Sequence, residues 1–263
     1  MNASRIGRFS LSLAAALLAM GTAGTHAAQI FWTDWTGSNA APTPFTGQGT
    51  ITTNTTTIGV TYQNANGIGF YQPSGGIDYW IGGSGQTSPY TSAAVDNRPT
   101  GTDIIALSKA GTQTLTFSQT VANPVFAFVS LNGNGYAFDQ DFELLSLGGV
   151  DGNACGYWGC GGASKVVKDL GGGQFEYQLN SNGVGGTEPH GALRFTGAFD
   201  KVTWRSSTNE FWNGFTVGVQ GSAAEVFEPP PVVPGIPEPG TVALMGVGLG
   251  LVAAAARRRS RRS

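Results

Sequence analysis

Short runs of β-favouring residues, separated by tight-turn signals, fill the middle of this chain from Gln29 onward. Leu115 and Phe117 alternate with threonine and serine, as expected for a half-buried strand, and no stretch has a long helical period. Close spacing of such runs predicts an all-β domain, an antiparallel β-sandwich of the jelly-roll-like kind. Asn-Gly pairs, which supply the positive φ angles of tight hairpins, recur at Asn66-Gly67, Asn132-Gly133, Asn134-Gly135, Asn182-Gly183 and Asn213-Gly214.

The predicted strands share this pattern of β-branched and aromatic residues between turn signals. They are Ile30–Trp35, Gly49–Thr53, Ile58–Tyr62, Ile68–Tyr71, Ile77–Ile81, Asp103–Ser108, Thr112–Ser118, Val125–Leu131, Gln140–Leu147, Phe175–Asn180, Ala192–Thr196, Lys201–Ser206 and Gly214–Gln220.

The first 27 residues have the composition of a secretory signal peptide. Arg5 and Arg8 precede an apolar run from Phe9 to Met20, and small residues at Thr25 and Ala27 fit a cleavage site after Ala27. We therefore expect residues 1–27 to be removed, leaving residues 28–226 as the folded, exported domain.

The C-terminal region has three parts in a fixed order. Residues 227–236 form a proline-rich, semi-rigid linker. Residues 241–256 are an uncharged apolar run that predicts a short transmembrane helix. The arginines from Arg257 to Arg262 would hold the end of this helix on the cytoplasmic side of the membrane.

Directly before the apolar run stands Ile236-Pro237-Glu238-Pro239-Gly240. This motif, followed by the helix and the arginine cluster, resembles the PEP-CTERM sorting signal over residues 237–263, although Ile236 stands where the family usually has valine. In that family Pro-Glu-Pro, here Pro237, Glu238 and Pro239, is read by a membrane protease-transpeptidase called exosortase, in Gram-negative bacteria that make extracellular polysaccharide. The resemblance implies export, transient anchoring in the inner membrane, and delivery to the cell surface, the outer membrane or the extracellular matrix.

The net charge of the chain between its two ends argues against one class of partner, nucleic acids. Only 11% of the residues are charged, and the part between the two ends has seven basic against 15 acidic residues, an excess of eight negative charges. Such a surface repels phosphate backbones, so we expect no nucleic-acid partner.

Two cysteines, Cys155 and Cys160, enclose Gly-Tyr-Trp-Gly. In an exported protein this spacing favours a local disulfide, with free thiols or a catalytic cysteine as the alternatives. The enclosed Tyr157 and Trp158 could expose two rings that stack on sugar faces; the alternative is ordinary packing.

Asp139, Asp141 and Glu143 alternate with Phe138, Gln140, Phe142 and Leu144, in and just before the predicted strand Gln140–Leu147. On one face of a strand these carboxylates could hold Ca²⁺, completed by oxygens of Asn132, Asn134 and Asp151. The alternatives are the solvated side of a half-buried strand and a glycosidase carboxylate pair. No other cofactor is expected.

Few residues suggest catalysis. Once the signal peptide is removed, His190 is the remaining histidine, and we expect it to be solvated in a loop. We therefore predict a protein that is not an enzyme: an exported surface or matrix protein, sorted by its tail and binding exopolysaccharide. The alternatives are a secreted polysaccharide hydrolase and a purely structural or adhesive module.

Overall fold

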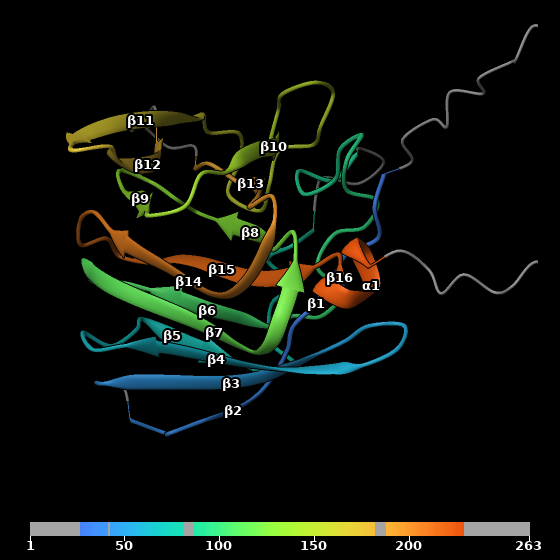
Figure 1. Ribbon diagram of the computed structural model, residues 1–263. Coiled ribbons are helices and arrows are strands. Elements are labelled where there is room, and N and C mark those ends of the chain that lie inside the picture. Colours follow the sequence, from blue (N-terminus) through green and yellow to red (C-terminus); the bar gives the residue numbers. More distant parts are fainter. Residues whose placement is uncertain (1–26, 42, 82–86, 182–187, 229–263) are drawn as a thin grey trace, which may run out of the picture.

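The computed structural model describes residues 27–41, 43–81, 87–181 and 188–228, which form two antiparallel β-sheets and one short helix (Figure 1). In spatial order, the strands of the seven-stranded sheet are β10 (Glu143–Leu147), β13 (Gly191–Arg194), β8 (Val125–Val129), β15 (Asn213–Val219), β6 (Ile104–Leu107) and β5 (Phe70–Gln72), with β1 (Phe31–Trp32) beside β15.

The nine-stranded sheet contains the longer strands, and the helix follows its last member. In spatial order the strands are β11 (Ala163–Gly171), β12 (Gln174–Ser181), β9 (Gly135–Phe138), β14 (Ala198–Ser206), β7 (Gly111–Ala122), β4 (Thr57–Asn64), β3 (Phe45–Thr52) and β2 (Asp34–Ser38), with β16 (Gly221–Ser222) beside β7 and α1 at Ala223–Phe227.

The two sheets pack face to face over an aromatic core. Phe126 on β8 and Phe215 on β15 stack with ring centroids 5.6 Å apart. From the other sheet, Trp204 on β14 meets both rings edge-on, at 5.2 and 5.1 Å. Offset and edge-to-face arrangements of this kind suit the ring quadrupoles, and they confirm the expected all-β architecture of two antiparallel sheets. The finer jelly-roll assignment stays a prediction.

The central strands of the seven-stranded sheet are buried on both faces, whereas β3 and β4 of the other sheet alternate between buried and less buried residues. Every residue of β8 and β15 is buried, but β3 and β4 alternate as half-buried strands do. The second face of these central strands is covered by residues 73–81 and 87–103, whose Trp80, Tyr90 and Val95 pack against it.

One predicted strand is absent from the structure, and another is shorter than predicted. Residues 77–81 form no strand, because they belong to the covering segment, where Trp80 is fully buried. The predicted strand Gln140–Leu147 begins only at Glu143, because residues 139–142 carry the chain from β9 in one sheet to β10 in the other.

The predicted signal peptide, apart from Ala27, and the predicted transmembrane helix at 241–256 lie outside the described residues, as does the linker from residue 229 onward. Within residues 27–41, 43–81, 87–181 and 188–228, no helix has the length and apolar character needed to cross a membrane.

Candidate functional site

Aromatic rings from three distant segments meet at one place on the surface. Tyr157 meets Tyr79 edge-on with centroids 5.1 Å apart, and Tyr79 meets Trp212 at the same distance. Phe70 closes the group 5.2 Å from Trp212, and Trp158 lies 4.9 Å from Tyr157. We call these five residues the aromatic cluster.

The cluster has a buried base and an exposed outer side. Tyr79 is 9% exposed, whereas Tyr157 and Trp158 are 36% and 45% exposed. Phe211, next to Trp212 in the chain, is 92% exposed. The exposed side of the cluster is therefore packed, through Tyr157, against the buried ring of Tyr79.

A disulfide closes the loop that carries Tyr157 and Trp158. It joins Cys155 to Cys160, whose Cα atoms are 4.6 Å apart. Inside the loop, the amide of Gly159 donates a hydrogen bond to the carbonyl oxygen of Gly156, at 3.2 Å. A covalent ring this small restricts the positions that its two aromatic side chains can take.

His190 anchors the same loop from below. Its Nε2 accepts a hydrogen bond from the amide of Trp158 at 3.2 Å, and its Nδ1 lies 2.6 Å from the carbonyl oxygen of Glu188. These partners fix the neutral tautomer with the proton on Nδ1, because Nε2 must accept. Burial lowers the pKa of His190 to about 4, so the ring stays neutral at ordinary pH.

The expectation that His190 is solvated was therefore wrong. Its side chain is fully buried, and a Cβ added at Gly156 would lie 2.1 Å from the Cγ of the ring. The sequence signal that could have revealed this contact was the glycine directly after Cys155. With both ring nitrogens bonded to backbone groups, His190 acts as a support for the loop.

The residue before Phe211 in the chain, Glu210, is a half-buried carboxyl group with two hydrogen-bond donors. Glu210 accepts hydrogen bonds from the amide of Asn132 and from Nδ2 of Asn213, each at 2.8 Å. Burial raises the pKa of Glu210 to about 7, and the nearby charge of Glu188 acts in the same direction. The protonation of Glu210 therefore changes near neutral pH, although both of its oxygens already have partners.

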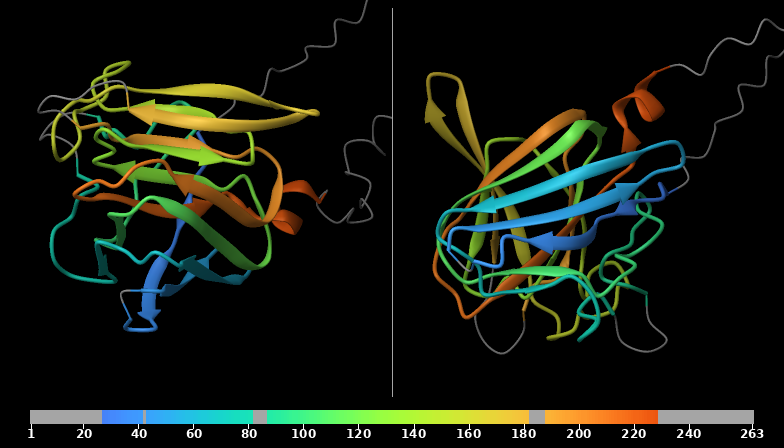
Figure 2. Two further views of the ribbon diagram at one scale, coloured as in Figure 1. Left: turned by 90° about the vertical axis from the view of Figure 1, so that its left-hand side faces the viewer. Right: turned by 90° about the horizontal axis from the view of Figure 1, so that it is seen from below.

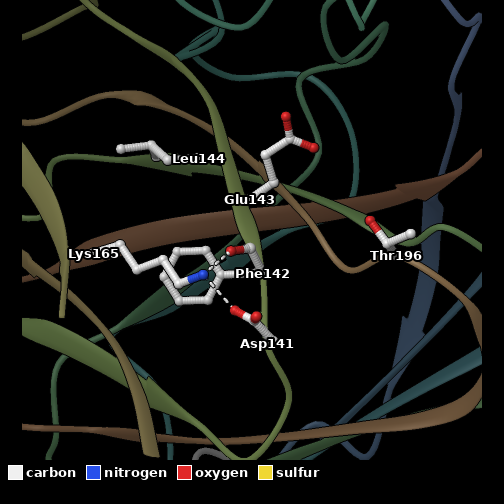
Figure 3. Close-up of a pocket in the computed structure, with 6 residues that line it drawn as sticks. All are labelled: Asp141, Phe142, Glu143, Leu144, Lys165 and Thr196. Atoms are coloured by element: carbon white, nitrogen blue, oxygen red, sulfur yellow. Dashed lines mark hydrogen bonds and ion pairs between the residues drawn. The ribbon is translucent and has the colours of Figure 1, made fainter. Parts of the chain in front are cut away.

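The structure does not bring Asp139, Asp141 and Glu143 together. Asp141 pairs with Lys165, which also donates to the carbonyl oxygen of Phe142 at 2.6 Å. Glu143 pairs instead with Arg194 at 2.6 Å. Asp141 and Glu143 line a cavity of about 510 Å³, but their carboxylates point apart (Figure 3).

The predicted Ca²⁺ site therefore has no preformed cage. The alternation that placed three carboxylates on one face fails because residues 139–142 are not part of a strand. Of the supplementary ligands, Asn134 accepts hydrogen bonds from the amides of Gly135 and Thr208. In the part of the chain that the structure describes, no three histidine, cysteine or carboxylate side chains are grouped closely enough to hold a metal ion.

The predicted sorting motif, Pro237, Glu238 and Pro239, lies outside the described residues. No curated protein and no solved structure matches the chain. Residues 235–260 match the family model of the PEP-CTERM protein-sorting motif. The prediction made from Pro-Glu-Pro and the tail is thus confirmed, and the chain carries the PEP-CTERM sorting signal of an exported protein that an exosortase processes.

Proposed function

We propose that this protein is a non-enzymatic component of the cell surface or extracellular matrix that binds exopolysaccharide through the aromatic cluster. The sorting motif supports export and a transient membrane anchor. The observation that carries the binding proposal is the pair of exposed rings, Tyr157 and Trp158, held on a disulfide-closed loop above the buried Tyr79.

Sugar rings present apolar C–H faces that stack on aromatic side chains, and their hydroxyl groups bond to the polar surroundings. A loop fixed by Cys155–Cys160 and by His190 loses little conformational freedom when a ligand binds, which favours affinity. The excess of negative charge in the domain argues for a neutral polymer, because an anionic one would be repelled.

The test is binding of the full-length protein to the neutral polysaccharide fraction that the producing cells secrete. Changing Tyr157→Ala or Trp158→Ala should weaken binding about fivefold or more, since the stacking of a planar base on an aromatic side chain contributes roughly 1–3 kcal/mol and we expect a similar contribution here. Phe175→Ala is the matched control, because Phe175 is 45% exposed on another part of the surface. Wild-type affinity in both loop variants would refute the sugar site and favour a purely structural module.

The sorting part of the proposal has its own test. Replacing Glu238 by Ala should block recognition by the exosortase, so that the unprocessed chain accumulates in the inner membrane instead of reaching the surface. Fractionation of the cell envelope distinguishes the two results, and normal delivery of the variant would contradict the proposal.

A secreted hydrolase is the second candidate, and one observation favours it. Burial raises the pKa of Glu210 to about 7, and the charge of Glu188 acts in the same direction. A carboxyl group with such a pKa keeps its proton at near-neutral pH, as the general acid of a glycosidase must. Release of reducing ends from the same polysaccharide, abolished by Glu210→Gln, would favour the hydrolase over the binding protein.

A further inference from the structure

β11 forms an open edge of the nine-stranded sheet. β12 pairs with one side of it, and no other strand within the described residues pairs with its outer side. The hairpin of β11 and β12 projects from the body of the domain (Figure 2). An edge strand of nine residues presents a row of backbone donors and acceptors that another strand can use.

The side chains along this edge are unusually apolar for their exposure. Val166, Val167 and Leu170 are 44%, 52% and 52% exposed. Apolar side chains beside unpaired backbone groups are the features that strand addition uses: backbone hydrogen bonds provide affinity, and side-chain pairs provide specificity.

We propose that this edge pairs with the same edge of a second copy of the chain, antiparallel and about a two-fold axis at Val167. The nine-stranded sheets of two molecules would then continue into each other.

Geometry limits the registers available to such a pair. Along an edge strand, every second residue points its backbone N–H and C=O groups away from the sheet. In an antiparallel pair, a residue whose backbone groups point outward lies opposite another such residue, and a residue whose groups point inward lies opposite another of that kind. In a two-fold pair of identical strands, one residue must therefore face its own copy on the axis. For β11 the choice reduces to which residue between Lys165 and Asp169 occupies that position.

Charge selects among these registers. An axis at Lys165, Lys168 or Asp169 sets like charges directly opposite each other, which destabilises a cross-strand pair. An axis at Val166 sets Lys165 opposite Val167, with no attraction.

Only an axis at Val167 sets opposite charges across the pair. There Lys165 faces Asp169 of the second copy, and by symmetry the same contact forms twice. Lys168 then faces an uncharged valine, Val166. Lys165 already contacts Asp141 and the carbonyl oxygen of Phe142. Its ammonium group has three donors, so a further carboxylate can join this group.

The experiment measures the mass of the full-length protein in detergent by analytical ultracentrifugation over a concentration series. The wild type should dimerise, and Asp169→Lys should raise the dissociation constant at least tenfold, because it sets two lysines opposite each other. Lys168→Glu is the matched control on the same strand and should change the constant less than threefold.

Cross-linking in whole cells tests the register separately. The two native cysteines are paired with each other, so an introduced cysteine has only its own copy as a partner. Val167→Cys should form a disulfide-linked dimer under mild oxidation, because opposing Cα atoms in such a pair are about 4.5–5.5 Å apart. Lys168→Cys should not, because residue 168 lies two positions away from its copy.

A dimer that tolerates Asp169→Lys and does not cross-link through Val167→Cys would overturn the proposal, since it would have to form elsewhere, for example through the tail. A wild type that stays monomeric at micromolar concentration would overturn it as well.

Discussion

The loop between Cys155 and Cys160 and the hairpin of β11 and β12 both expose apolar side chains, but they are held in different ways. The loop is closed by a disulfide, anchored by His190 and backed by Tyr79. The hairpin is held mainly by its own strand pairing. Its connection, Gly171 to Gly173, takes positive φ angles at all three residues and has open space around each.

The difference indicates what each region can bind. Side chains supported from beneath keep one arrangement, which favours a ligand with a fixed shape such as a sugar ring. Side chains along an open strand edge have free backbone groups beside them, which favours another strand. Apolar exposure alone would not distinguish these two uses.

The largest expected effect comes from placing one methyl group in each region. Gly156→Ala should lower the free energy of unfolding by about 3 kcal/mol, because the added Cβ would lie 2.1 Å from the buried ring of His190. Gly172→Ala, the matched change in the hairpin, meets no atom within 4 Å and costs roughly 1 kcal/mol for its positive φ of 63°. Urea unfolding at neutral pH measures both values.

Equal losses in the free energy of unfolding of these two variants would contradict the comparison. They would mean that the loop can shift to accommodate a methyl group as easily as the hairpin can. Polysaccharide binding should follow the same order, with Gly156→Ala impaired and Gly172→Ala unchanged.

The second prediction concerns the pH dependence of stability that results from the burial of His190 beneath the loop. The pKa of His190 is lowered to about 4 by burial, against 6.5 in an unfolded chain. As the pH falls from 6.5 towards 4, the unfolded chain takes up a proton that the folded protein does not. Stability is therefore lost over this window, on the order of 3 kcal/mol in total.

Unfolding curves between pH 4 and 7 measure this loss, and His190→Ala is the comparison, since its stability should vary less with pH. The raised pKa of Glu210 acts in the opposite direction, because that carboxyl group stabilises the fold as the pH falls from 7. The informative quantity is thus the difference between the wild type and the variant. A histidine that NMR shows to be protonated at pH 6 would refute the buried anchor.

The sequence predicted the parts of this molecule that depend on local pattern. Alternation such as Leu115 and Phe117 gave the two-sheet class, and the order of Pro-Glu-Pro, apolar run and arginines gave the sorting motif. Both signals lie within short stretches of chain, where residue spacing alone carries the information.

The aromatic cluster could be predicted only in part. Tyr157 and Trp158 were identified from their loop. The cluster itself depends on contacts between segments more than 50 residues apart, namely Tyr157 with Tyr79, Tyr79 with Trp212, and Trp212 with Phe70. The burial of His190 depends on the same long-range packing. The carboxylate alternation at residues 139–143 misled for the complementary reason: a periodic pattern does not reveal that the chain is crossing between sheets.

The smallest expected effect concerns an exposed ring on the hairpin. Phe175→Ala should change the free energy of unfolding by less than about 1 kcal/mol, because the ring is 45% exposed and its nearest aromatic neighbour, Tyr177, lies 6.5 Å away. Tyr157→Ala should cost more, although Tyr157 is comparably exposed, because it removes close contacts to Tyr79 and Trp158. Urea unfolding of the two variants tests whether support from beneath, rather than exposure, separates the two regions. A larger loss in Phe175→Ala would mean that the hairpin tip is packed as firmly as the loop.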